Sequence, residues 1–238
     1  MLDDSEVGRV LVVMAHPDDV DFSSGGTVAT FTDKGIEVVY CIATDGDAGG
    51  FDRMVDNGGM AELRRAEQAA AAACLGVTDI RFLGYSDGTV EPTIALRRDI
   101  ARVIRQVRPD RVITSSPERN YARVGPSHPD HRAVGSATLD AVYPDARNPY
   151  AFPELLADEG LEAWMVREVW LSGAQRNHYV DVTSTVERKI AALRAHESQT
   201  GHNADLAEFV KSFLTANAAE AGLPPGFYAE AFQVVPTA

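Results

Sequence analysis

The stretch VVMAHPDDVDFSSGGT, residues 12–27, ends an apolar run with four residues of a different kind. Its first residues are typical of a buried strand, and that pattern stops at His16-Pro17-Asp18-Asp19. A surface turn needs only one Asp or Asn together with a Gly. Two adjacent carboxylates repel each other unless a positive group lies nearby. The stretch therefore predicts a strand whose carboxyl end carries a charged site.

Strand and helix patterns alternate in the rest of the chain. Apolar strand patterns cover residues 9–15, 36–44, 79–84, 111–117 and 166–173, and helical patterns cover 23–35, 59–77, 93–109, 129–142, 184–198 and 204–222. This alternation predicts βαβ crossovers, a mainly parallel sheet and helices on both of its faces. We therefore expect a Rossmann-like, doubly wound α/β fold, with residues 1–238 forming a single domain.

Composition narrows the possible functions. With 22 basic and 35 acidic residues, the formal net charge is −13, which argues against sequence-independent binding to nucleic acid or to an anionic membrane. The amino terminus lacks the basic region of a signal peptide, and its apolar run is too short to span a membrane. Cys41 and Cys74 form no paired framework. We expect a cytoplasmic protein that binds a small molecule, and a homo-oligomer is compatible with the sequence.

The location of a ligand site follows from the predicted fold. In parallel sheets of this kind, ligands bind beyond the carboxyl ends of the strands. A dinucleotide-binding domain carries G-x-G-x-x-G after its first strand, whereas this chain has His-Pro-Asp-Asp there. A nicotinamide-dependent dehydrogenase is therefore set aside.

The first polar cluster suits a metal ion. His16 and Asp19 lie three residues apart on a turn that the ring of Pro17 stiffens. An imidazole nitrogen and a carboxylate oxygen are both good zinc ligands, and a catalytic zinc site has three protein ligands and one open position. One further ligand is therefore needed.

A second cluster, GPSHPDHRAVG at residues 125–135, follows the fourth predicted strand. Ser127, with Asp130 three residues later, resembles a capping arrangement at the start of a helix. His128 and His131 would then project from one side of the first helical turn. Because both clusters follow strands of one sheet, they can converge at the same edge.

The two clusters carry a resemblance to a known family. The segments AHPDD, GGT and HPDH, in that order, resemble the PIG-L/LmbE family of zinc-dependent N-deacetylases. The resemblance extends through ELRRAEQAAAAACLGV, FLGYSDG and RKIAALRAHESQ, so it covers most of the chain. It implies a hydrolase with Zn²⁺ as cofactor, although another divalent metal is possible.

The resemblance also implies residue roles. The metal ligands would be His16, Asp19 and His131. Asp18 would be the general base for the attacking water, and His128 would stabilise the oxyanion and assist the leaving amine. The chemistry agrees, because zinc lowers the pKa of a coordinated water to about 7 and an adjacent carboxylate can take its proton. We expect His128 to act as an imidazolium, so that the alkaline limb of kcat/KM follows the loss of its proton.

Four more polar residues receive roles. Arg64 and Asp87 would contact the substrate, although a solvated helix arginine and an ordinary turn aspartate are the alternatives. Asp130 would orient one of the histidines through a hydrogen bond. Many relatives read His-Pro-Asp-Asp-Glu, whereas here Val20 follows and Asp21 takes the place of that Glu, as a residue that would support the metal ligands without binding the metal. This departure shifts the resemblance toward the branch that contains the bacillithiol-pathway deacetylases, within a family that also includes mycothiol-pathway deacetylases.

The predicted activity is removal of an N-acetyl group from an N-acetylglucosamine-type amino-sugar conjugate. An amidase that acts on thiol-sugar S-conjugates is the alternative within the hydrolases. A catalytically silent sugar-binding protein is the alternative from another class, but a pure binder has no use for a base beside an open metal position. Of the other histidines, His178 is expected in a partly buried loop, and His196 is expected to pack or to orient a site residue.

Overall fold

A computed structural model describes residues 1–50, 56–121 and 124–237 of the chain. Their strands form one seven-stranded sheet in the order β3-β2-β1-β4-β5-β7-β6. The strands are β1 (Arg9–Met14), β2 (Glu37–Thr44), β3 (Asp79–Tyr85), β4 (Arg111–Ser115), β5 (Glu168–Ser172), β6 (His178–Asp181) and β7 (Ala229–Pro236). β1 to β5 are parallel, and β7 is antiparallel to both β5 and β6.

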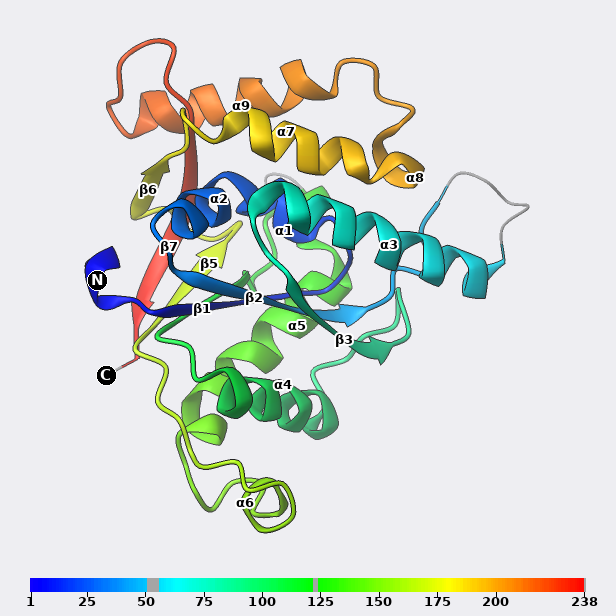
Figure 1. The fold of residues 1–238 in the computed structure, drawn as a ribbon, viewed down its shortest axis with the longest axis vertical. Coiled ribbons are helices and arrows are strands. Elements are labelled where there is room, and N and C mark those ends of the chain that lie inside the picture. The colour runs from blue at the N-terminus through cyan, green and yellow to red at the C-terminus, as the bar shows by residue number, and fades with distance from the viewer. Residues whose placement is uncertain (51–55, 122–123, 238) are drawn as a thin grey trace.

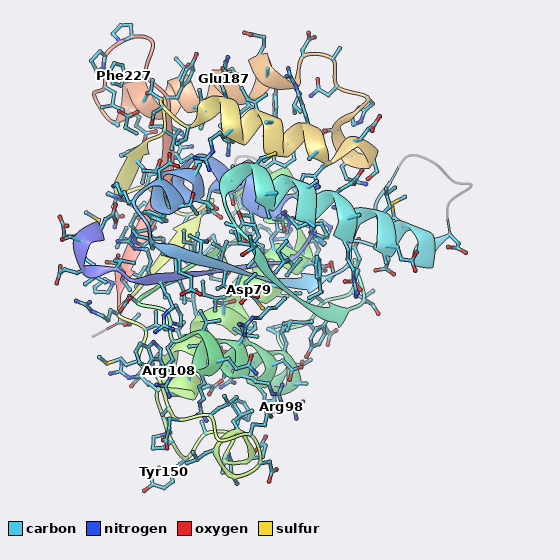
Figure 2. The ribbon with its side chains drawn as sticks, in the orientation of Figure 1. Asp79, Arg98, Arg108, Tyr150, Glu187 and Phe227 are labelled. Atoms are coloured by element: carbon cyan, nitrogen blue, oxygen red, sulfur yellow. The ribbon has the colours of Figure 1, made fainter. Side chains whose placement is uncertain are left out.

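Helices cover both faces of the sheet (Figure 1). They are α1 (Asp19–Ser23), α2 (Gly25–Asp33), α3 (Asn57–Leu75), α4 (Ile94–Val107), α5 (Pro129–Asp140), α6 (Glu154–Ala157), α7 (Val186–Ala195), α8 (Glu197–Thr200) and α9 (Leu206–Glu220), with short helical turns η1 (Asp4–Glu6), η2 (Gly125–Ser127) and η3 (Ala141–Ala146). α2, α3 and α7 lie on one side of the sheet, with α9 outside α7, and α4 and α5 lie on the other. Glu187 of α7 and Arg98 of α4 therefore appear at opposite sides of the molecule (Figure 2). No described helix is both long and apolar enough to cross a membrane.

The core follows from the two-residue period of the strands. Leu11 and Val13 of β1 pack into the cluster beneath α4 and α5, whereas Val10 and Val12 pack into the cluster on the α2–α3 side. Side chains alternate between the faces of a strand, so a strand that is apolar at every position must be covered on both faces. The predicted two-sided α/β fold is confirmed.

The strand order fixes where a ligand site can form. From β1 the chain winds outward through β2 and β3, and it then returns to place β4 on the other side of β1. This reversal is the topological switch point of a doubly wound sheet, where ligands bind beyond the carboxyl ends of the two central strands. His16 follows β1 and His128 follows β4, so both predicted clusters lie at this point.

The structure departs from the predicted elements at both ends of the chain. The helix expected over 23–35 is two helices, α1 and α2, and the first begins at Asp19. β6 and β7 were not predicted. His178, expected in a loop, lies in β6, where its ring packs 4.8 Å from that of Trp170. Both extra strands have mixed polarity, and their strand structure depends on pairing with each other and with β5.

Candidate metal centre and active site

The chain turns sharply after β1 and brings the first polar cluster together. The Asp19 carboxylate accepts a hydrogen bond from the backbone N–H of His16 at 2.9 Å, which closes the turn. Asp18 precedes helix α1 with φ 90° and ψ −27°, in the left-handed region. A residue other than glycine in this region costs on the order of 1–3 kcal/mol and persists only where its surroundings hold it. The base predicted from the sequence therefore lies at a strained backbone position.

Three predicted ligands meet at one point, and we call them the donor cluster: His16, Asp19 and His131. His16 Nδ1 and His131 Nε2 are 3.2 Å apart. Asp19 Oδ1 lies 3.0 Å from His131 Nε2, and Asp19 Oδ2 lies 3.4 Å from His16 Nδ1. In a tetrahedral zinc site with bonds of about 2.0–2.1 Å, neighbouring ligand atoms are about 3.3 Å apart. The pairwise distances are thus close to those between ligand atoms around one zinc ion, with Asp19 reaching His131 through Oδ1 and His16 through Oδ2.

The second nitrogen of His16 faces two more carboxylates. Its Nε2 lies 2.9 Å from Asp87 Oδ1 and 3.2 Å from Asp130 Oδ2. Asp130 is fully buried and also accepts hydrogen bonds from the backbone N–H groups of Gly88 and Val90. A carboxylate behind a metal-binding histidine fixes the ring orientation and increases its basicity. The contacts leave Nδ1 as the nitrogen of His16 that faces the donor cluster.

The charges of the cluster favour a cation. Burial lowers the pKa of His16, but hydrogen bonds with Asp19 and Asp87 outweigh burial and raise the pKa to about 11. Burial raises the pKa of Asp19, but the charge and hydrogen bond of His131 and the hydrogen bond of His16 hold it well below its usual range. Carboxylates thus stabilise positive charge at this point, and a metal ion that binds here must displace the proton of the imidazole.

His128 begins helix α5 and lies beside the cluster. Its ring centroid is 5.0 Å from that of His16 and 5.3 Å from that of His131. Its Nδ1 accepts a hydrogen bond from the backbone N–H of Asp130 at 3.3 Å, so the neutral ring carries its proton on Nε2. The capping arrangement predicted for Ser127 is wrong, because His128 is the N-cap and Ser127 Oγ accepts from the N–H of Asn120 instead.

The protonation state expected for His128 is also corrected. Burial lowers the pKa of His128, and the charges of His16 and His131 lower it further. A metal cation in the same place would act in the same direction. His128 is therefore a neutral hydrogen-bond donor at neutral pH, not an imidazolium.

Two further groupings of possible metal ligands include the same histidine. One is His16, His128 and His131, and the other is His16, Asp87 and Asp130, each with ligand atoms within 4.8 Å of one another. In the first, His128 Nδ1 already accepts the Asp130 N–H; in the second, the carboxylates contact Nε2 of His16. Because these atoms already have hydrogen-bond partners, we treat the donor cluster as the better fit to a metal ion.

Asp18 lies beside the donor cluster and is bound by Arg64 of α3. Arg64 Nη2 donates to Asp18 Oδ2 at 3.0 Å and to the carbonyl of Pro17 at 2.6 Å, and Nη1 donates to the carbonyl of Gly46 at 3.0 Å. Burial and the neighbouring charge of Asp19 raise the pKa of Asp18 to about 7, although Arg64 opposes this rise. A carboxyl group with a pKa near neutrality suits general base chemistry.

The structure gives the two predicted substrate residues protein partners. Arg64 is only 4% exposed, and a Cβ at Gly46 or Gly49 would lie 2.3 or 2.6 Å from its Nη1. The glycine-rich loop thus packs directly on the guanidinium. Asp87 contacts His16 and accepts from the N–H of Ala48. Both side chains stabilise the site, and substrate contact by either one stays a prediction.

Asp21 and its partners complete the site. Asp21 is fully buried, and its Oδ2 contacts His196 Nε2 at 2.8 Å and Gln68 Nε2 at 3.0 Å. Gln68 was not predicted, although it follows Arg64 by four residues and must share its face of α3. Helical spacing was thus the only signal in the sequence that could have indicated it.

The chain belongs to the PIG-L family. The family model, described as GlcNAc-PI de-N-acetylase, matches residues 11–142. The chain is 34% identical to the diacetylchitobiose deacetylase of Thermococcus kodakarensis over 98% of this chain and 85% of that protein. It is 31% identical to a probable N-acetyl-alpha-D-glucosaminyl L-malate deacetylase 2 of Bacillus cereus, over 81% of this chain and 84% of that protein.

Solved structures agree with this assignment. The N,N'-diacetylchitobiose deacetylase of Pyrococcus horikoshii, solved with an inhibitor, superimposes with a TM-score of 0.87 at 30% identity. The match covers 98% of this chain and 85% of that one. The similarity therefore extends over nearly the whole of this chain.

Proposed function

We propose that this protein is a metal-dependent hydrolase that removes the N-acetyl group from an N-acetylglucosamine-type amino-sugar conjugate. The observation that carries the proposal is the donor cluster with Asp18 and His128 beside it, at the switch point of the sheet. The relatives named as deacetylases of N-acetylated sugars support the reaction class. We further propose that residues 1–238 act as a single domain and that the protein is cytoplasmic, in keeping with its two free cysteines.

The proposed metal is Zn²⁺, held by His16, Asp19 and His131. Two imidazole nitrogens and a carboxylate are a donor set that zinc accepts in catalytic sites, with one position left open. When bound, zinc would acidify a water molecule and polarise the amide carbonyl. Asp130 and Asp87 would keep the His16 ring in the orientation that binds.

Asp18 and His128 supply the proton transfer and the charge stabilisation. Asp18 takes a proton from the attacking water, and Arg64 keeps its carboxylate in place for this step. The Nε2–H of His128 donates a hydrogen bond to the oxygen of the tetrahedral species as its negative charge develops. The carboxyl group of Asp18 then returns the proton to the leaving amine, so that free acetate and an amino sugar result.

Arg64 and Asp87 remain proposed contacts for the sugar. Asp87 has one oxygen on His16 and the other on the N–H of Ala48. A carboxylate oxygen accepts more than one hydrogen bond, so this pairing leaves capacity for a sugar hydroxyl. The aglycone is a small molecule, and neither nucleic acid nor a membrane is proposed as a partner.

The proposal is tested by measuring acetate release with zinc-loaded protein. The substrates are N,N'-diacetylchitobiose, N-acetylglucosaminyl-malate, N-acetylglucosaminyl-inositol and a thiol-sugar S-conjugate amide. We expect acetate from at least one N-acetylated sugar, loss of activity in EDTA and recovery with zinc. Asp18→Asn should keep its metal and lose most activity, whereas His131→Ala should lose both.

Other outcomes would identify the alternatives. Hydrolysis of the S-conjugate alone would indicate the thiol-sugar amidase. Thermal stabilisation by sugars without any turnover would indicate a silent sugar-binding protein. A purified protein that holds no divalent metal and is indifferent to EDTA would contradict the proposal itself.

A further inference from the structure

We propose that Gln68 is a positioning residue for the catalytic base, and that it connects Asp18 to Asp21 and His196 through its side-chain amide. The inference rests on the proposed role of Asp18. It concerns a residue of α3 that touches neither the donor cluster nor its flanking carboxylates in any described hydrogen bond. Its effect would therefore act through Asp18.

The oxygen and the nitrogen of the Gln68 side-chain amide make different hydrogen bonds. Gln68 is fully buried, and its Oε1 accepts a hydrogen bond from the backbone N–H of Asp18 at 2.9 Å. Its Nε2 donates to Asp21 Oδ2 at 3.0 Å. A backbone N–H can only donate and an ionised carboxylate can only accept, so the two contacts together allow one orientation of the amide. While Asp21 is unchanged, a side chain that lacks either the donor or the acceptor cannot make both contacts.

Residues of the carboxyl-terminal helices contact Asp21 and support its hydrogen bond with Gln68. His196, at the junction of α7 and α8, places Nε2 2.8 Å from the same Oδ2 of Asp21, and both side chains are fully buried. Lys189 of α7 donates from Nζ to the backbone carbonyl of Asp21 at 2.7 Å. The base is thus connected to elements that lie 175 residues away from Asp21 in sequence.

Helix α3 holds Asp18 at two points. Arg64 binds the carboxylate, and Gln68, one helical turn later, binds the backbone amide. Asp18 needs such support because its φ of 90° is disfavoured for any residue with a Cβ. Loss of the amide contact would let the peptide between Pro17 and Asp18 rotate toward a relaxed conformation. The carboxylate would then leave the position from which it can take a proton.

The neighbouring residue provides a matched control. Glu67 is buried on the same helix and also connects α3 to α8, because its carboxylate accepts from both the N–H and the Oγ of Ser198 at 2.7 Å. It has no described contact with residues 16–21. Glu67→Gln therefore weakens the attachment of the carboxyl-terminal helices and leaves the amide of Asp18 untouched.

The test compares Gln68→Met with Glu67→Gln in zinc-loaded protein. Methionine has nearly the volume of glutamine and lacks both hydrogen-bonding groups. Gln68→Met should lower kcat by on the order of 10- to 100-fold, because a displacement of about 1 Å at a reacting group has this effect. KM and zinc stoichiometry should stay within about twofold of wild type. Glu67→Gln should lower Tm and keep kcat.

A double-mutant cycle shows whether Gln68 acts through Asp18. In an Asp18→Asn background, Gln68→Met should cause no further loss of kcat, because the group that it positions is already inactive. An equal loss in both backgrounds would overturn the proposal. So would a wild-type kcat in Gln68→Met.

Two further measurements keep the proposal testable if Gln68→Met folds poorly or the substrate is not among those assayed. The swapped pair Gln68→Glu with Asp21→Asn restores an acceptor for Asp18 and a donor between the two side chains, and needs only the other tautomer of His196. It should recover most of the activity that Gln68→Glu alone loses. Independently of turnover, hydrogen exchange at the Asp18 amide should accelerate at least tenfold in Gln68→Met and not in Glu67→Gln. An unchanged exchange rate would overturn the proposal even if the protein proves to be no deacetylase.

Discussion

The Arg64 guanidinium and the Asp18 carboxylate form a largely buried ion pair, with Nη2 and Oδ2 3.0 Å apart and side chains 5% and 16% exposed. Two opposing effects act on the carboxylate. Burial and the charge of Asp19 raise its pKa to about 7, and Arg64 acts to lower it. Arg64 therefore affects the pKa of the base. Because its guanidinium also donates to two backbone carbonyls, it fixes the position of the Asp18 carboxylate as well.

Arg64→Met should impair both stability and catalysis. Loss of one partner leaves the other charge buried, and we expect the free energy of unfolding to fall by about 3 kcal/mol. Without Arg64 the pKa of Asp18 rises, so the base is protonated over a wider range and the acid limb of kcat moves to higher pH. Urea unfolding and a pH–rate profile measure the two effects.

Arg65→Met is the control for this variant. Arg65 is half-exposed and pairs with Asp45 on the surface, where an ion pair contributes about 0–1 kcal/mol. It should change neither the acid limb nor the unfolding free energy by a comparable amount. Equal effects of the two substitutions would contradict a special role for Arg64.

His128→Ala should separate catalysis from metal binding. Loss of a donor to the developing oxyanion typically lowers kcat by about 10²–10³-fold. The alkaline limb of the pH profile should persist, because the pKa of His128 is lowered by burial and by two neighbouring histidines and the ring has already lost its extra proton at neutral pH. Metal analysis should find wild-type zinc content. A flattened alkaline limb would mean that His128 titrates as the acid after all.

Asp130→Asn should weaken metal binding through His16. The fully buried Asp130 contacts His16 Nε2, and loss of such a supporting carboxylate typically lowers metal affinity by about 10–100-fold. Competition with a chromogenic chelator measures the affinity. Asp145→Asn is the control, since Asp145 is also buried but pairs with Arg97. An unchanged affinity in Asp130→Asn would show that the orientation of His16 does not depend on this contact.

Local patterns predicted the central sheet and the convergence of the two polar clusters, whereas the choice of His16, Asp19 and His131 as the metal ligands came from the family resemblance. His16 and Asp19 share a turn, and His131 follows another strand of the same sheet, so strand order alone brings them together. The site contacts that the sequence analysis missed join residues that are far apart in the sequence. Gln68 contacts Asp18 across 50 residues, and no local pattern marks a buried glutamine as a support.

The protonation state of His128 also depends on contacts that the sequence does not show. Sequence spacing placed His128 beside His131, but it could not show that the Asp130 N–H binds Nδ1 or that the ring is buried. These contacts decide its protonation state. The strand β7 escaped prediction for a similar reason, because its polar Glu230 interrupts the apolar pattern and is buried only through its partners.

Glu230 leads to the last prediction, which concerns the attachment of β7 to the amino-terminal half of the chain. Its carboxylate pairs with Lys189 Nζ at 2.6 Å and accepts hydrogen bonds from the backbone N–H groups of Gly26 and Thr27 at 3.0 and 2.7 Å. Lys189→Met removes the cation and the donor to the backbone carbonyls of Asp21 and Phe22. Glu230→Met leaves the Lys189 ammonium without its counter-charge and two buried N–H groups without an acceptor. A buried N–H without a partner is tolerated less often than an under-satisfied carbonyl.

Glu230→Met should therefore be the more destabilising substitution. Breaking the buried pair costs about 3–5 kcal/mol in either variant, and each unsatisfied N–H adds about 1–3 kcal/mol. The double variant should be less stable than wild type but more stable than the sum of the single losses predicts, because the pair interaction is counted only once. Urea unfolding of the three variants measures this order. If Lys189→Met were as damaging as Glu230→Met, the hydrogen bonds from Gly26 and Thr27 would contribute no more to stability than those from Lys189 to the carbonyls of Asp21 and Phe22.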